Sequence, residues 1–152
     1  MILATLCYVQ KNGKTLMMHR TKRDRDIHQG KWNGLGGKMH AHETPEACVI
    51  REVKEESGLT LYRPRLRGVL TFPDFDGKQD WYAFLFTANE YEGELIECDE
   101  GHLEWIEDDK LGGLPLWEGD YLFFEWLKKG LFFSAKFVYR EGKLQEHSVC
   151  FY

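Results

Sequence analysis

The sequence predicts a single α/β domain over residues 1–152, in which a mixed sheet packs between helices. Three observations predict it. The length of 152 residues suits one compact domain, and 43% hydrophobic and 14% aromatic residues are enough for a sizeable core. β-prone apolar runs alternate with two helix patterns that carry start and stop residues. No internal repeat or Pro/Ser-rich linker separates a second domain.

The N-terminal part predicts a hairpin followed by loops. Residues 2–10 are apolar and β-prone, Lys11-Asn12-Gly13-Lys14 is a turn signal, and Thr15 to Arg20 forms the returning strand. The highly charged residues 21–31 predict an exposed loop. The glycine-rich stretch 32–38 (Trp-Asn-Gly-Leu-Gly-Gly-Lys) is too short for a helix.

The first helix has clear ends. Thr44 is a suitable N-cap, Pro45 occupies the first helical position, and Gly58 is a natural C-terminal stop. A second helix is predicted at 120–129, with Asp120 as its cap and Gly130 as its stop. The remaining strands are predicted at 66–73, 80–88, 102–107, 132–140 and 143–151, with a turn at 140–143 between the last two.

Composition excludes several classes of partner. The formal net charge is -5, from 25 acidic and 20 basic residues, so no general field attracts nucleic acid or membrane surfaces. No apolar run is long enough to span a bilayer, and the N-terminus lacks a basic leader. The cysteines are widely spaced and form no C-x-x-C pair, which indicates reduced thiols in a cytoplasmic protein: Cys7, Cys48, Cys98 and Cys150.

Glu52, Glu55 and Glu56 share one face of the first helix, within about one third of its circumference. The arrangement is locally unfavourable, because like charges at i,i+3 and i,i+4 repel and the helix dipole disfavours anions in the last turn. Three convergent carboxylates supply hard oxygen ligands, and Mg²⁺ relieves their repulsion. The alternative is a solvated acidic face without a ligand.

The residues around this face form a longer pattern. Gly37 and Glu43 precede Arg51-Glu52, which is followed by Val53, by Glu55-Glu56 and by Gly58-Leu59. This stretch resembles the Nudix signature, G-x5-E-x7-R-E-U-x-E-E-x-G-U with U apolar, at every fixed position of residues 37–59. The resemblance implies the Nudix fold, an α/β/α sandwich, and hydrolysis of a nucleoside diphosphate linked to another group.

By that resemblance, Glu52, Glu55 and Glu56 bind metal ions, while Arg51 and Glu43 hold the helix and loop in place. Phosphoryl chemistry needs charge neutralisation on the phosphate oxygens and an activated water, and metal ions supply both. Mg²⁺ is the expected cofactor, with Mn²⁺ as a substitute.

Further segments resemble the oxidised-purine triphosphatases of the MutT branch, which cleave 8-oxo-dGTP to the monophosphate and pyrophosphate and so prevent mutation. These segments are residues 32–38, Asp99-Glu100, and Trp117 followed by Asp120. The resemblance implies that Asn33 and Asp120 hydrogen-bond the base and that Trp117 stacks on it.

The same resemblance also implies roles for residues at the other end of the site. Glu100 adds a carboxylate to the metal site and to the catalytic set, and Arg20 lies near the phosphates or sugar. Gly36 and Gly37 let the backbone approach ion and phosphate, and Lys38 joins the substrate-binding residues.

Position 119 departs from the pattern. Relatives with Trp-x-x-Asp can carry two adjacent acids, and here the first of them is Gly119. Glu118 precedes it and is a candidate substrate-binding replacement, although a one-residue shift changes the direction of its side chain.

Structural roles remain open for four of these residues. Asp120 can serve only as a helix cap, Trp117 only as core, Asn33 only in a turn, and Glu100 only as a solvated acid. The general base is also left open.

The rival functions are another Nudix substrate (dinucleoside polyphosphate, ADP-ribose or an RNA 5′-triphosphate end) and a nucleotide-binding regulator without catalysis. The expected partner is a nucleoside triphosphate, with no nucleic-acid polymer and no membrane, for a monomer or homodimer.

Overall fold

A computed structural model describes residues 1–21 and 30–152. Most of the predicted loop at 21–31 therefore lies outside the described residues. No helix in the described part of the chain is long and apolar enough to cross a bilayer.

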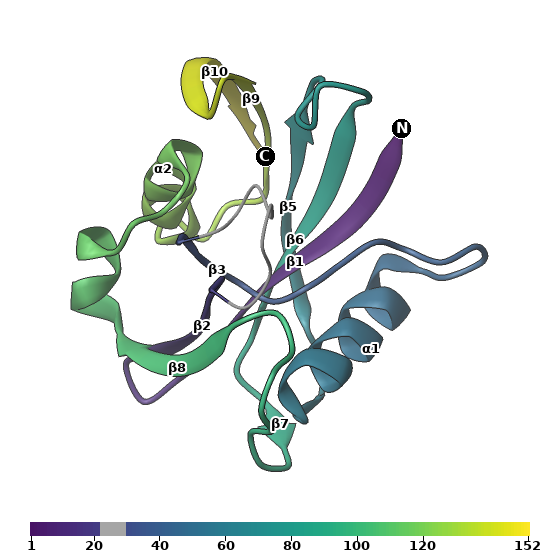
Figure 1. The fold of residues 1–152 in the computed structure, drawn as a ribbon, viewed down its shortest axis with the longest axis vertical. Coiled ribbons are helices and arrows are strands. Elements are labelled where there is room, and N and C mark those ends of the chain that lie inside the picture. Colours follow the sequence, from purple (N-terminus) through teal and green to yellow (C-terminus); the bar gives the residue numbers. More distant parts are fainter. Residues whose placement is uncertain (22–29) are drawn as a thin grey trace.

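The centre of the molecule is a mixed sheet (Figure 1). Five long strands follow one another in the order β10-β9-β5-β6-β1. β1 runs parallel to β6 and β5 runs parallel to β9, whereas β5–β6 and β9–β10 are antiparallel. Their bounds are β1 Ile2–Lys11, β5 Arg65–Phe72, β6 Trp81–Ala88, β9 Phe133–Arg140 and β10 Lys143–Phe151.

A second group of strands continues the same sheet beyond the first hairpin. β2 (Lys14–His19) pairs with β1 only beside the turn, then pairs with β8 (His102–Glu107) along its whole length and with β3 (Trp32–Asn33). β4 (Thr60–Leu61) and β7 (Tyr91–Glu92) form a separate small pair.

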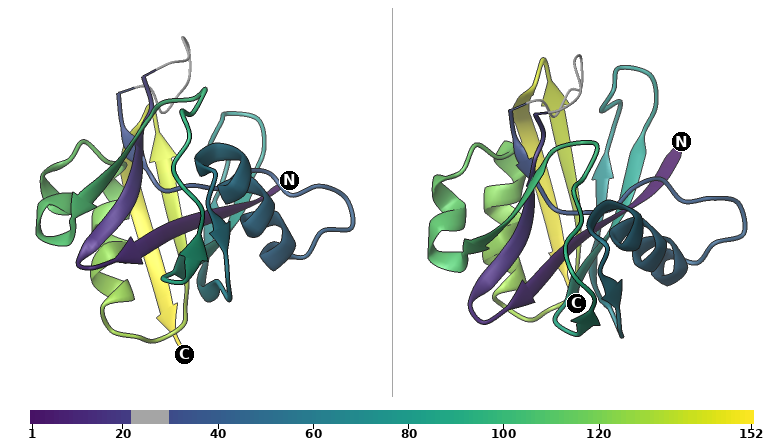
Figure 2. Two further views of the ribbon diagram at one scale, coloured as in Figure 1. Left: turned by 90° about the horizontal axis from the view of Figure 1, so that it is seen from below. Right: turned by 60° about the horizontal axis from the view of Figure 1, so that its bottom comes forward.

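Two helices cover opposite faces of the sheet, as Figures 1 and 2 show. The alternation of β1 explains this: Cys7 and Val9 pack with Val53 of α1 (Pro45–Ser57), whereas Tyr8 packs with Phe123 of α2 (Glu118–Leu127). The predicted fold class, an α/β/α sandwich with a mixed sheet, is confirmed.

The ends of α1 are those predicted. Thr44 caps it by accepting a hydrogen bond from Ala47 N at 3.0 Å, Pro45 begins it, and Gly58 ends it in the left-handed conformation at φ 83°. The long strands also match their predictions to within one or two residues.

The start of α2 differs from the prediction. Its N-cap is Trp117, and Asp120 lies in the first turn as its third residue. A buried carboxylate at this position receives a hydrogen bond from the Trp117 backbone amide, which is the arrangement of a capping box. Asp120 therefore supports the helix start from inside the helix. The sequence patterns also missed β3, β4, β7 and the 3₁₀ helix Asp108–Gly113, which are all short.

Candidate active site

A glycine loop runs along the edge of β1 and leads into α1. Thr5 N donates to Gly37 O at 2.9 Å, and Cys7 N donates to Leu35 O at 2.6 Å. Gly36 adopts φ 146°, and a Cβ on it would lie 2.0 Å from Thr5 O. Only glycine allows the loop to approach the strand so closely.

The backbone of the glycine loop also contacts Glu56 of α1. Gly36 N donates to Glu56 Oε1 at 2.7 Å, and Glu56 is 8% exposed. Burial raises the pKa of Glu56 above its usual range, the Gly36 hydrogen bond opposes the rise, and the nearby charges of Glu100 and Glu52 add to it. Glu56, Glu52 and Glu100 therefore form one electrostatic cluster, although Glu100 comes from a distant loop.

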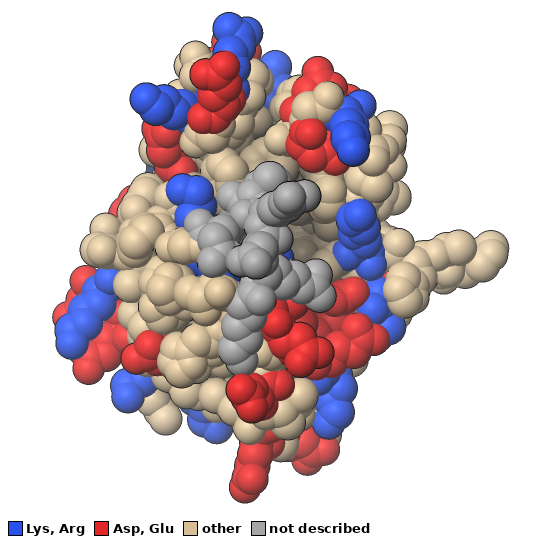
Figure 3. Space-filling model, in the orientation of Figure 1, with Lys and Arg blue, Asp and Glu red and all other residues tan. Residues whose placement is uncertain are grey.

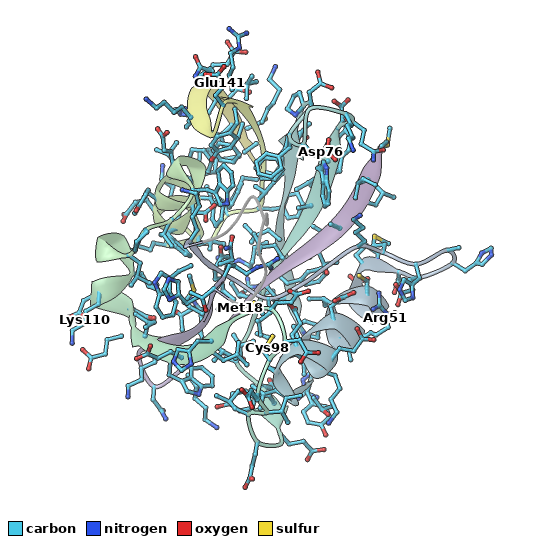
Figure 4. The ribbon with its side chains drawn as sticks, in the orientation of Figure 1. Met18, Arg51, Asp76, Cys98, Lys110 and Glu141 are labelled. Atoms are coloured by element: carbon cyan, nitrogen blue, oxygen red, sulfur yellow. The ribbon has the colours of Figure 1, made fainter. Side chains whose placement is uncertain are left out.

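Arg51 balances the charge on the other side of this cluster. Its guanidinium contacts Glu43 through two nitrogens, at 2.7 and 2.9 Å, and Glu52 at 2.8 Å. It also reaches Glu55 at 3.4 Å and Lys38 O at 3.2 Å, so it joins α1 to the glycine loop (Figure 4). Hydrogen bonds from Arg51, and from the His40 backbone, hold the pKa of Glu43 well below its usual range.

Acidic side chains gather on the surface over α1 in Figure 3, where the helix carries its glutamates. Glu55 is the exposed member, with 59% of its side chain accessible. Glu100 is less exposed and forms a salt bridge with Arg20 at 3.2 Å. Arg20 thus lies beside the carboxylate cluster.

The donor set suits a hard divalent cation. Among residues 1–21 and 30–152, no three His, Cys, Asp or Glu side chains already converge as metal ligands. Glu52 faces Arg51, and Glu56 faces Gly36. However, three carboxylates close enough to raise the pKa of one member repel one another, and a cation removes that repulsion. The carboxylates present therefore fit a hard divalent cation.

A cavity of about 330 Å³ opens beside the cluster. Most of the residues that the sequence predicted for metal or substrate line it: Arg20, Asn33, Gly36, Gly37, Lys38, Glu100, Trp117 and Asp120. The helix glutamates adjoin it, since Gly36 bonds Glu56 and a Cβ on Gly37 would lie 2.5 Å from the Glu52 carboxylate. The structure thus brings together residues from the whole length of the chain.

One predicted residue is elsewhere. Glu118 Oε1 accepts a hydrogen bond from Leu144 N of β10 at 3.1 Å, and Glu118 does not appear among the residues that line the cavity. The one-residue shift from position 119 turns its side chain from the cavity toward the last strand.

The far end of the cavity is aromatic. Trp117 is 9% exposed, and its ring lies 5.0 Å from that of Phe75 and 5.2 Å from that of Tyr139, measured between centroids. Lys31 Nζ lies 4.9 Å above the same ring. Four aromatic residues of this end were not predicted from the sequence: Phe72, Phe75, Trp81 and Tyr139. They belong to no motif, and strand alternation alone does not reveal which sheet face borders a cavity.

Two buried polar groups lie among these rings. Asn33 Nδ2 is buried and has no hydrogen-bond partner among the described residues. Burial raises the pKa of Asp120 to about 8, although the Trp117 amide and the charge of Lys31 oppose the rise. An unpaired buried amide costs stability, and an acceptor supplied by another molecule in the cavity would remove that cost.

Comparison with known proteins identifies the family of the chain. A family model described as the NUDIX domain matches residues 2–127. An uncharacterised Nudix hydrolase, YvcI of Bacillus subtilis, is 35% identical over 83% of this chain and 78% of its own. An oxidised purine nucleoside triphosphate hydrolase of Danio rerio is 35% identical over 97% of this chain and 89% of its own.

A solved structure of a mutator MutT protein from Bacillus halodurans superposes with a TM-score of 0.86 at 31% identity, over 98% of this chain and 97% of that one. The signature predicted from residues 37–59, the sandwich fold and these relatives agree. The chain belongs to the Nudix family of hydrolases, which cleave phosphoanhydride bonds in nucleotide substrates and use divalent metal ions.

Proposed function

We propose that the protein is a Mg²⁺-dependent hydrolase of oxidised purine nucleoside triphosphates, with 8-oxo-dGTP as its substrate and the monophosphate and pyrophosphate as products. One observation carries the proposal. The cavity joins a carboxylate and glycine-loop end to an aromatic end that holds the unpaired Asn33 amide. A nucleoside triphosphate has the same two ends, and the Danio rerio relative is named for this substrate class.

At the aromatic end, the base would lie against Trp117. Asn33 and Asp120 would hydrogen-bond its edge. Asn33 offers both an N–H donor and a carbonyl acceptor, and a neutral Asp120 carboxyl offers an O–H donor and an acceptor as well. Such a mixed set can distinguish an oxidised purine from an ordinary one, because oxidation at C8 adds a carbonyl and converts N7 into a donor.

At the other end, Glu52, Glu55, Glu56, Glu100 and the Gly36 carbonyl would hold the metal ions. Bound Mg²⁺, or Mn²⁺ in its place, neutralises phosphate charge and lowers the pKa of water. Arg20, Lys38 and the Gly37 backbone would bind the phosphates.

The chain's own residues then orient the reaction. Arg51 holds Glu52 at 2.8 Å and the loop carbonyl of Lys38 at 3.2 Å, so it keeps α1 and the glycine loop in one arrangement. Glu52, Glu56 and Glu100 are the candidates for the general base, which must accept the proton of the attacking water.

The remaining predictions belong to the same proposal. Residues 1–152 would act as one domain, because β9 and β10 lie in the sheet with β5 and Tyr139 lines the cavity. Cys7, Cys48, Cys98 and Cys150 form no disulfide with one another, which agrees with a cytoplasmic protein. The proposal also includes a monomer or homodimer as the oligomeric state. By removing oxidised nucleotides from the pool, the protein would protect DNA.

The test compares release of pyrophosphate from 8-oxo-dGTP, dGTP and ADP-ribose in millimolar Mg²⁺, with and without EDTA. We expect kcat/KM for 8-oxo-dGTP to exceed that for dGTP by at least about tenfold, a difference of about 1.4 kcal/mol in transition-state stabilisation. We also expect EDTA to remove activity. Equal rates on 8-oxo-dGTP and dGTP, or faster hydrolysis of ADP-ribose, would reject the substrate assignment.

A further inference from the structure

Position 119 has no space for a side chain. Gly119 is the second residue of α2, and a Cβ built on it would lie 2.8 Å from Phe137 Cδ1 and 2.8 Å from Tyr139 Oη. Both neighbours belong to β9, which packs in the sheet. An acidic residue at 119 would therefore require β9 or the helix start to shift, and the neighbouring Glu118 bonds Leu144.

The Tyr139 hydroxyl occupies the place that such a side chain would take. Gly119 N donates to Tyr139 Oη at 2.8 Å, which fixes the phenol beside the first turn of α2. The ring packs edge-on against Trp117 with centroids 5.2 Å apart, and Tyr139 lines the cavity. It lies two residues before Glu141, labelled in Figure 4, near the β9–β10 turn.

The hydroxyl remains a donor. Burial and the nearby charges of Asp120 and Glu118 raise the pKa of Tyr139, although the Gly119 hydrogen bond opposes the rise, so the phenol keeps its proton. The Gly119 amide donates to a lone pair of the Tyr139 oxygen, so this contact does not use the O–H hydrogen. A half-buried phenol next to a cavity is thus able to donate to a bound molecule.

We infer that Tyr139 determines specificity, by donating a hydrogen bond from Oη to a carbonyl oxygen of an oxidised purine base. The inference rests on the proposed function and adds Tyr139 to Asn33 and Asp120 as a polar group of the base pocket. A hydrogen-bond donor at this point favours a base edge with a carbonyl over an edge with an amino group. An amino group is itself a donor, so the Tyr139 O–H and the amino N–H would both lack an acceptor.

The test measures kcat and KM of wild type and Tyr139→Phe on 8-oxo-dGTP, dGTP and dATP; the base of dATP has no carbonyl. We expect kcat/KM to fall about tenfold on 8-oxo-dGTP, mostly through KM, and less than about twofold on dATP. The matched control is Tyr121→Phe. Tyr121 Oη also bonds backbone groups near the start of α2, those of Leu116 and Leu114, but it is absent from the cavity lining.

Partial unfolding of Tyr139→Phe would lower the rates on all three nucleotides by the same factor. The ratio of kcat/KM between substrates therefore still tests the inference. An equal fall on all three, no fall, or the same selective fall in Tyr121→Phe would overturn the inference.

Calorimetric titration with 8-oxo-dGMP and dAMP measures base recognition without hydrolysis, since neither monophosphate can release pyrophosphate. It therefore tests the role of Tyr139 separately from the proposed function. If wild type shows no preference for 8-oxo-dGTP, the proposed function fails. Weaker binding of 8-oxo-dGMP alone by Tyr139→Phe would still support the role of Tyr139, and unchanged binding would overturn it.

Discussion

The two ends of the cavity are built in different ways. The carboxylate end comes mainly from α1 and the loop before it, and Arg51 balances the charges of Glu43 and Glu52 there. The aromatic end combines β3, the β5–β6 loop, the start of α2 and β9, and it buries Asp120 and the Asn33 Nδ2 atom. Local sequence therefore encodes the chemistry of the first end, whereas tertiary packing creates the recognition surface of the second.

The comparison predicts that the carboxylate end controls turnover. Glu56→Gln should lower kcat by about 100- to 1,000-fold, because it removes a charged ligand from the cluster. The fold should remain, since Gln Oε1 can still accept the hydrogen bond from Gly36 N. Pyrophosphate release and thermal melting measure the two effects.

Glu146→Gln is the control for Glu56→Gln, because it removes an exposed acid of β10. It should leave kcat unchanged. Near-wild-type turnover in Glu56→Gln would contradict the assignment of the metal site to this helix.

At the aromatic end, we expect a substitution that lowers activity to raise the stability of the unliganded protein. Asn33→Leu should lower kcat/KM on 8-oxo-dGTP by about 10- to 100-fold, because the base loses its partner. It should also stabilise the unliganded protein by about 1 kcal/mol, because the buried, unpaired Nδ2 disappears. Urea unfolding without nucleotide provides the second measurement, and a loss of both stability and activity would mean that Asn33 has a structural role.

Arg51 links the carboxylate cluster to the glycine loop, and its two-pronged contact with Glu43 cannot be reproduced by lysine. Arg51→Lys should lower kcat/KM by about tenfold and reduce the melting temperature. The same change at Arg63, an exposed residue paired with Glu90, should alter neither. An Arg51→Lys protein with normal activity would show that the loop holds its position without the guanidinium.

The smallest expected effect concerns pH and Asp120. Burial raises its pKa in the folded protein to about 8, well above the usual range of an aspartate, so the folded state binds more protons than the unfolded state between about pH 4 and 8. The free energy of unfolding should therefore fall as pH rises from about 4 to 8, by at most about 1.4 kcal/mol per pH unit from this group. Asp120→Asn lacks this titration and should show a flatter profile.

Urea unfolding of both proteins at four pH values between 5 and 8 measures the Asp120 effect. Parallel stability profiles would show that Asp120 is ionised in the folded protein and would weaken its role as a neutral hydrogen-bond donor to the base.

Motifs predicted the parts of the site that depend on short-range spacing. The helix with Glu52 and Glu56 follows from a 3.6-residue repeat and from the caps Thr44 and Gly58, which act within a few residues. Spacing did not reveal that Glu100 joins these glutamates, because the link depends on how the loop before β8 packs. The resemblance to a family supplied that residue.

The sequence alone determined the acidic face of α1 and the order of helices and strands that predicted the fold class, because caps and side-chain periodicity act within each segment. The strand–loop–helix unit followed from the resemblance to the Nudix family. Only the tertiary structure decided that Tyr139 replaces a side chain at position 119, that Glu118 turns to β10, and that Asp120 is buried. These features depend on contacts that α2 makes with β9 and β10. Side-chain volumes decide which of these contacts fit.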